Sequence, residues 1–301
     1  MKIGIIGAGN VGSTIAYTLV INNIASEIVL VDTNTAKAKA EANDIMHATP
    51  VSHNVKINDG DYEDIKGAGI VIITAGSRRK PGQTRTDLLE INTKIFASIV
   101  PEIVKYAPES IIIIASNPVD VMAHITLKLS GFPPNRIIAS GTILDTARLQ
   151  SILSRHLAIS PKYINAYVLG EHGDSQTLIW SGLKNGKITK KLMEDIDNEV
   201  RYGGKKIIEG KGATFYGIGC CVARLCQAII NDENAVFTVS SHRSEAEGIK
   251  DVFASYPTVI NKNGIGKILK PEISNEEKQL LIKSIEAVKA NTKTALAAIN
   301  K

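Results

Sequence analysis

Short apolar runs alternate with helical patterns over the first 140 residues. One of them, Ile111-Ile112-Ile113-Ile114, is apolar at every position, which is typical of a strand buried on both faces of a parallel sheet. Strands that alternate with helices form β-α-β crossovers. The pattern therefore predicts an α/β fold with a doubly wound parallel sheet, whose ligands bind at the carboxyl ends of the strands. The runs occupy residues 2–6, 27–31, 69–73, 110–115 and 136–139.

The pattern changes near residue 140, where a second kind of organisation begins. No internal repeat or low-complexity linker separates the two parts, so we expect them to share an interface. We predict two domains, 1–140 and 141–301, and the second should be an α+β substrate domain. Its expected elements are a helix at about 145–158, a strand at about 164–169, helices at about 190–208 and 212–231, two or three strands between 235 and 268, and a helix from Asn275 onward.

A glycine-rich turn directly follows the first apolar run. Gly7, Gly9 and Gly12 form G-x-G-x-x-G, and a helix is predicted to open at Ser13. In such a turn the first glycine makes the bend, the second lets the backbone approach a pyrophosphate, and the third allows close helix–strand packing. The N-terminus of the helix attracts the phosphates. This context predicts a Rossmann-type dinucleotide site.

Asp32 closes the second apolar run, twenty residues after Gly12. A carboxylate there accepts hydrogen bonds from the adenine ribose and repels a 2′-phosphate, which predicts NAD rather than NADP. Small residues end the third run, where a dinucleotide can pass close to the backbone. The residues expected to contact NAD are Gly7, Gly9, Asn10, Val11, Gly12, Asp32, Thr74, Ala75, Gly76 and Asn117.

Three side chains beyond residue 140 can bind and protonate a 2-oxo acid. Arg148 offers the planar fork that binds a carboxylate bidentately. His172, in Leu-Gly-Glu-His-Gly-Asp, can exchange a proton near neutral pH, and Asp145 can hold its ring in one tautomer. By itself an Arg three residues after an Asp is more often a surface ion pair. The preceding dinucleotide motif gives the triplet its weight.

Each of two loops near the strand ends is compatible with a functional and with a purely structural interpretation. Asn117 can hydrogen-bond the nicotinamide ribose or the substrate, although Asn-Pro is also a common turn. The charged segment 77–85 is interpreted as a lid over the substrate, and an ordinary solvated loop is the alternative.

Composition restricts the classes of function. Net charge is +5, but basic residues are scattered among acidic ones, which does not favour a nucleic-acid site. No apolar run is long enough to cross a bilayer, and residues 1–6 are interpreted as a strand rather than a signal peptide. We expect no metal, and a cytoplasmic protein with buried, unreactive thiols at Cys220, Cys221 and Cys226. The other histidines, expected on the surface or in helices, are His47, His53, His124, His156 and His242.

The chain resembles the lactate/malate dehydrogenase family of L-2-hydroxy acid dehydrogenases over essentially its whole length. The matching pieces are Gly7–Gly12, Asp32, Thr74–Gly76, the loop through Asp87-Leu88-Leu89, Asn117–Asp120, Leu144–Arg148 and Gly170–Asp174. The resemblance implies that His172 transfers the proton, Asp145 orients it, and Arg148 clamps the substrate carboxylate. It also implies that Arg85 polarises the carbonyl, that Asn117 contacts the substrate or the ribose, that Thr214 contacts the substrate, and that the enzyme is a homodimer or homotetramer.

Within the family, the position six residues before Arg85 separates lactate-type from malate-type enzymes. The former carry Gln and the latter Arg, and here the residue is Arg79. A buried guanidinium facing the methyl group of pyruvate is unpaired, whereas oxaloacetate offers it a second carboxylate. We therefore predict malate and oxaloacetate. Because Ser140–Asp145 and Thr214 resemble the lactate group, an L-lactate dehydrogenase or a broader L-2-hydroxy acid dehydrogenase is the alternative.

The chain departs from the family pattern at three places, one of which is a shorter stretch after Trp180. Gln150 and Asn165 occupy positions that are basic in members activated by fructose 1,6-bisphosphate, so we expect no such activation. Gly203-Gly204 lies within a helical pattern, where each glycine costs about 1 kcal/mol relative to alanine. Close helix packing across a subunit interface and a kink within one subunit are both compatible with this pair.

Two other function classes are open to test. A glycosidase of similar fold would need a metal-binding Cys near the strand ends, and the first Cys is residue 220. A nucleotide sensor could have the same fold without catalytic activity. The chain retains the side chains needed for catalysis, which favours an enzyme: Asp145, Arg148, His172 and Arg85.

Overall fold

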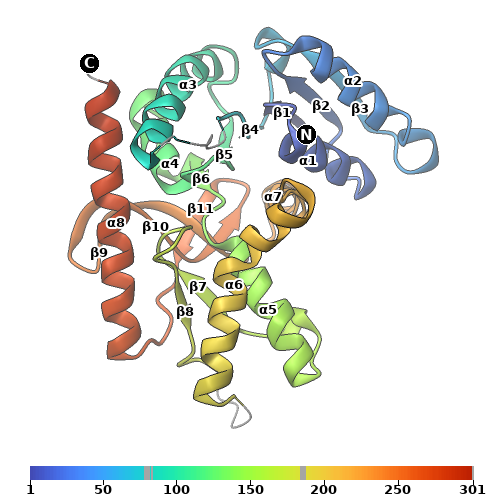
Figure 1. Cartoon of the computed structure of the whole chain (residues 1–301). Coiled ribbons are helices and arrows are strands. Elements are labelled where there is room, and N and C mark those ends of the chain that lie inside the picture. The colour runs from blue at the N-terminus through green and yellow to red at the C-terminus, as the bar shows by residue number, and fades with distance from the viewer. Residues whose placement is uncertain (78–81, 83, 184–187, 300–301) are drawn as a thin grey trace.

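Within the described residues, six parallel strands form the larger part of a nine-stranded sheet, in the order β6-β5-β4-β1-β2-β3 (Figure 1). The computed structural model describes residues 1–77, 82, 84–183 and 188–299. The order and the parallel pairing confirm the predicted doubly wound sheet. The strands are β1 (Lys2–Ile6), β2 (Glu27–Val31), β3 (Lys56–Gly60), β4 (Ile70–Ile73), β5 (Ile111–Ile114) and β6 (Ile137–Ala139).

Helices cover both faces of this part of the sheet. The first face packs against α1 and α2 and, from the second half of the chain, α7. The second face packs against α3 and α4. The helices of the first half are α1 (Asn10–Ile21), α2 (Thr35–Met46), α3 (Arg85–Tyr106) and α4 (Val119–Ser130), with short 3-10 turns at Thr49–Val51, Glu63–Ile65 and Pro134–Arg136.

The strand β3 is absent from the sequence prediction. It lies at the edge of the sheet and reads Lys-Ile-Asn-Asp-Gly, with Ile57 as its only fully buried side chain. An edge strand has one neighbour and a solvated face, so it lacks the continuous apolar run that marks the central strands.

The second half extends the same sheet and adds a small sheet of two strands. The strand β9 pairs antiparallel with β6 through Ala139 and Ser240, and β10 and β11 follow it outward. The predicted elements are confirmed with shifted bounds, but β8 was not predicted and β7 is only three residues long. The elements are α5 (Ile143–Leu157), a 3-10 turn (Pro161–Tyr163), β7 (Tyr167–Leu169), β8 (Thr177–Ile179), α6 (Lys190–Lys211), α7 (Tyr216–Ile230), β9 (Ala235–Ala246), β10 (Ile249–Asn261), β11 (Gly264–Ile268) and α8 (Asn275–Ile299).

Candidate active site

The glycine turn joins β1 to α1 and is shaped by two close approaches. Gly7 has a φ of +108°, and a Cβ there would lie 2.6 Å from the amide nitrogen of Ala75. A Cβ on Gly12 would lie 1.9 Å from the carbonyl oxygen of Gly7. Around Gly9, by contrast, no atom lies within 4 Å of where a Cβ would be. Two glycines are thus required by the fold, and the third leaves open space that a ligand can use.

Asp32 lies beside this turn, at the end of β2. Its carboxylate accepts hydrogen bonds from the amides of Ala8, at 2.7 Å, and Asn34, at 2.8 Å. On the other side, the hydroxyl of Thr74 donates to the carbonyl of Gly7 at 2.7 Å. The residues therefore fit a dinucleotide, because they combine a glycine cradle, a helix N-terminus at Asn10 and Val11, and a carboxylate directly after β2 that can accept hydrogen bonds from ribose hydroxyls.

The ends of β4 and β5 are tied together next to the turn. Asn92, on α3, accepts from the amide of Ser77 at 2.7 Å and donates to the carbonyl of Asn117 at 2.7 Å. The hydroxyl of Ser116 donates to the carbonyl of Ala75 at 2.6 Å. The peptide between Asn117 and Pro118 is cis. These bonds leave the Asn117 side chain exposed at the carboxyl end of β5.

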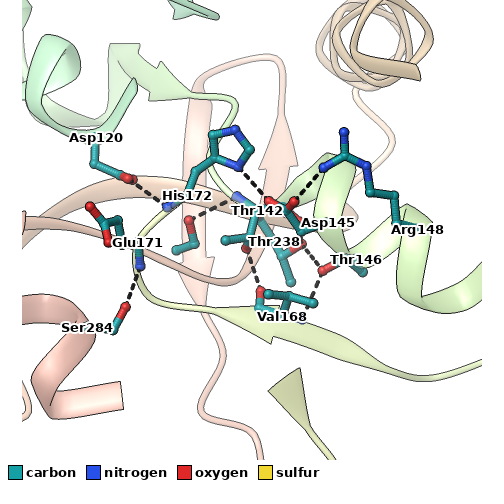
Figure 2. A network of polar contacts seen from close by, with 11 residues as sticks. Asp120, Thr142, Asp145, Thr146, Arg148, Val168, Glu171, His172, Thr238 and Ser284 are labelled. Carbon is teal, nitrogen blue, oxygen red and sulfur yellow. Dashed lines mark hydrogen bonds and ion pairs between the residues drawn. The ribbon is translucent and has the colours of Figure 1, made fainter. Parts of the chain in front are cut away.

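His172, Asp145 and Arg148 come together as the sequence predicted (Figure 2). The Nδ1 of His172 lies 2.5 Å from Asp145 Oδ2, and Arg148 Nη1 donates to Asp145 Oδ1 at 2.9 Å. Asp145 is buried, whereas the side chains of His172 and Arg148 are 24% and 17% exposed. One buried carboxylate therefore bridges two groups that reach solvent.

The charges of this trio set its protonation. The Asp145 carboxylate raises the pKa of His172, against the effect of burial. Burial by itself would raise the pKa of Asp145, but His172 and Arg148 outweigh it and hold that pKa below its usual value. The protonated imidazole and the ionised carboxylate are thus the favoured pair. Because Nδ1 faces Asp145, Nε2 is the atom left to exchange a proton with a ligand.

A network of threonines holds the start of α5, which carries Asp145. The hydroxyl of Thr142 donates to the carbonyl of Val168 at 2.5 Å, and the amide of Val168 donates to Thr146 at 3.0 Å. Thr238, on β9, donates to the Thr146 hydroxyl at 2.8 Å. The first turn of α5 is therefore tied to β7 and to β9, and both lie in the second half of the chain (Figure 2).

Asp120 is part of the site, although the sequence argument gave it no function. Its Oδ2 accepts the backbone amide of His172 at 2.9 Å, and burial raises the pKa of Asp120 to about 6. Ser284, on α8, accepts the amide of Glu171 at 2.8 Å. The sequence feature that could have identified Asp120 is its acidic side chain within an apolar helix, three positions after Asn117.

Two cavities adjoin these residues. One, of about 360 Å³, is lined by Asn117, His172 and the first turns of α3, and by Asn291 and Thr294 of α8. The other, of about 680 Å³, is lined by Arg148 and Thr214, between α5 and α6. Thr214 therefore lines the same cavity as the predicted carboxylate-binding arginine.

The charged loop is described only in part. Arg79 lies outside the described residues, and of Arg85 only the backbone is described, at the start of α3. That helix begins there because Thr84 accepts the Asp87 amide at 3.1 Å while Asp87 accepts the Thr84 amide at 2.9 Å.

Two minor predictions are wrong in the structure. His242 lies in β9, half-buried, with Nε2 2.9 Å from an Asp251 oxygen, rather than on the surface or in a helix. Cys220 is exposed and Cys221 is half-buried, so only Cys226 is a fully buried thiol. All three cysteines lie on α7, where the helix period turns the first of them outward.

The described residues hold neither a candidate metal cluster nor a membrane-spanning helix. Among them, no three or more His, Cys, Asp or Glu side chains are grouped so as to hold a metal ion. No helix within the described part of the chain is long and apolar enough to span a membrane.

Comparisons with known proteins agree on one family. Residues 1–139 match the model of the lactate/malate dehydrogenase NAD-binding domain, and residues 142–299 match its α/β C-terminal domain. An L-lactate dehydrogenase of Thermus aquaticus is 47% identical over 302 residues, covering 96% of this chain and 97% of that protein. One of Allorhizobium ampelinum is 48% identical over 302 residues, covering 96% of this chain and 97% of the relative.

A solved structure adds the same result in three dimensions. The crystal structure of MGS-M5, a lactate dehydrogenase from a Medee basin deep-sea metagenome library, has a TM-score of 0.94 and 36% identity and covers 98% of each chain. The two family models leave almost none of the 301 residues unmatched. The chain therefore belongs to the lactate/malate dehydrogenase family and is an NAD-dependent oxidoreductase that acts on CH–OH groups.

Proposed function

We propose that this enzyme is an L-lactate dehydrogenase, which interconverts pyruvate and L-lactate. The observation that carries the choice is the name of its full-length relatives at 47% and 48% identity, which are L-lactate dehydrogenases. The malate preference predicted from Arg79 finds no support in the comparisons, which favour the alternative. The lactate-like residues Ser140–Asp145 and Thr214 agree with this substrate.

The reaction needs a carboxylate clamp, a proton donor and a polarised carbonyl. Arg148 binds the substrate carboxylate through its guanidinium, which now pairs with Asp145 through Nη1. Arg85 polarises the ketone, and Asn117 and Thr214 complete the contacts with the substrate. Bound NADH supplies the hydride that the carbonyl carbon receives.

His172 completes the reduction. Its Nε2 gives a proton to the ketone oxygen, and the product is a 2-hydroxy acid. The Asp145 carboxylate, held 2.5 Å from Nδ1, stabilises the imidazolium before the transfer and fixes the tautomer afterwards. In the reverse direction neutral His172 accepts the hydroxyl proton. The raised pKa of His172 keeps its imidazole protonated when pyruvate binds.

Malate dehydrogenase is the second candidate, and Arg79 is the observation that favours it. Lactate-type members carry Gln at this position, so Arg79 is not the residue expected for an enzyme that acts on lactate. The two candidates differ in a measurable ratio, because a site built to pair a polar group can reject an analogue lacking it by about 10⁴–10⁵-fold.

The deciding experiment is kcat/KM for pyruvate and for oxaloacetate, in the wild type and in Arg79→Gln. We expect the wild type to prefer pyruvate, and Arg79→Gln to raise that preference further. A wild type that prefers oxaloacetate, with a preference reversed by Arg79→Gln, would establish malate as the substrate instead.

The assembly and the domain division are part of the same proposal. We expect a homodimer or homotetramer in the cytoplasm, with domains at 1–140 and 141–301. Sedimentation of the purified protein measures the first of these, and a monomer with full activity would contradict it.

A further inference from the structure

Two adjacent glycines occupy the middle of α6. Gly203 and Gly204 lie within a 22-residue helix, which begins after the Thr189 cap and ends at Gly212. Glycine is unfavourable inside a helix because it loses more backbone freedom than alanine. Two adjacent glycines therefore suggest a specific contact that a larger side chain would disturb. The helix α6 packs against α5, and the contact lies between these two helices.

The side chain that faces both glycines is Arg148. A Cβ on Gly204 would lie 3.3 Å from Nη2, 3.8 Å from Nη1 and 3.9 Å from Cζ of its guanidinium. A Cβ on Gly203 would lie 3.8 Å from Cδ and 3.9 Å from Nε. A third glycine of the same helix, Gly210, has no atom within 4 Å of where its Cβ would be.

The guanidinium of Arg148 is also held by Asp145. Nη1 of Arg148 donates to its Oδ1 at 2.9 Å, and the aliphatic stem belongs to α5. The guanidinium therefore rests between a buried carboxylate and the bare backbone of α6. The cavity of about 680 Å³ is lined by Arg148 and Gly203, so the arginine borders open space on a further side.

We propose that Gly203 and Gly204 are positioning residues for the substrate carboxylate, because the missing Cβ atoms set where the Arg148 guanidinium lies. The inference rests on the proposed function of Arg148 as the carboxylate clamp. A methyl group on Gly204 meets Nη2 closer than ordinary van der Waals contact, so the guanidinium must move by a few tenths of an ångström. Bidentate pairing depends on the fork's placement, so the shift weakens substrate binding more than it weakens the chemistry.

The test compares three single substitutions on one helix. Gly204→Ala should raise the KM for pyruvate by about tenfold while kcat changes less than threefold and the Kd for NADH stays constant. Gly203→Ala, whose Cβ meets Arg148 at ordinary contact distance, should raise KM by about threefold or less. Gly210→Ala is the matched control and should leave KM unchanged. All three should keep or raise Tm, since alanine favours the helix.

A double-mutant cycle separates positioning from packing. In an Arg148→Lys background the terminal fork is absent, so adding Gly204→Ala should change KM by less than about twofold. An equal effect in both backgrounds, an unchanged KM in Gly204→Ala, or a KM rise accompanied by a lower Tm would each overturn the proposal.

The proposed function is tested separately in the same assay. Every measurement is repeated with oxaloacetate, which carries the same 2-oxo carboxylate. If the wild type reduces oxaloacetate and not pyruvate, the lactate assignment fails. The Gly204→Ala effect on the KM for oxaloacetate then decides the inference about Arg148.

Discussion

The glycine turn and the His172 site solve different physical problems. The turn is one contiguous segment, Gly7–Gly12, in which the backbone itself forms the site and the requirement is space. The His172 site gathers Asp120, Asp145, Arg148 and His172 from α4, α5 and the loop after β7, and its requirement is charge held out of water. Ligand binding at the glycine turn should be sensitive to added side-chain volume. The function of the His172 site should instead be sensitive to the loss of a charged or hydrogen-bonding partner. Substitutions in the two sites should therefore have different effects on stability, binding and catalysis.

The largest effect is expected at the proton donor. His172→Ala should lower kcat for pyruvate reduction by about 10²–10⁴-fold or more, because no other group in the site carries the proton. NADH binding, measured by fluorescence titration, should be nearly unchanged, since the glycine turn is intact. His156→Ala is the control, because His156 is exposed at the end of α5 and should have no effect. Normal turnover in His172→Ala would remove this residue from the mechanism.

The next effect separates two glycines of the same turn. Gly12→Ala places a Cβ 1.9 Å from the Gly7 carbonyl oxygen, so it should lower Tm and abolish NADH binding together. Gly9 has φ −77° and ψ −176°, which alanine adopts freely, and its Cβ meets no protein atom. Gly9→Ala should therefore keep its Tm but bind NADH about 10–100-fold more weakly, since the methyl group occupies space for the pyrophosphate. Equal losses of Tm in both variants would contradict the distinction between fold and ligand.

The smallest effect is a shift of a pH profile. The pKa of His172 is raised chiefly by the Asp145 carboxylate, and the Asp120 charge adds to it. Pyruvate reduction needs protonated His172, so its rate falls as pH rises through that pKa. Asp120→Asn removes one negative charge and lowers the pKa of His172, so the fall should begin at a lower pH than in the wild type.

Ser284 provides the control for this shift, because it bonds the backbone next to His172 but carries no charge. Ser284→Ala loses the acceptor of the Glu171 amide, so it should alter activity without moving the midpoint of the profile. If both variants displace the midpoint equally, Asp120 acts by holding the loop alone.

The sequence predicted the turn well because its evidence is local. Gly7, Gly9, Gly12 and Asp32 lie at fixed spacings around two buried strands, and these spacings follow from backbone geometry. The central strands were placed for the same reason, since burial on both faces leaves an unbroken apolar run. The edge strand β3 has one buried position among exposed ones, and β8 is only three residues long, so neither carries such a run.

The charged site was only partly predictable. Asp145, Arg148 and His172 were identified from their chemistry and then from the family resemblance, but the bond between Asp120 and the His172 amide joins residues 52 positions apart. Likewise, the reason for Gly203-Gly204 is a side chain on another helix, which no pattern within α6 reveals. Contacts of this kind arise from tertiary packing, and a single sequence carries no periodic signal for them.

The antiparallel pairing of Ala139 with Ser240 has a consequence for how the chain folds during its synthesis. The strand β6 is the open edge of the parallel half until β9 arrives, and its residues Ile137, Ile138 and Ala139 are fully buried in the finished protein. About a hundred residues must be translated between these partners, which takes roughly 5–20 s at ordinary rates. During that interval an apolar strand edge is exposed, and an edge of this kind can pair with another chain. The nascent enzyme is therefore most prone to aggregation after its cofactor-binding half has emerged and before β9 covers it.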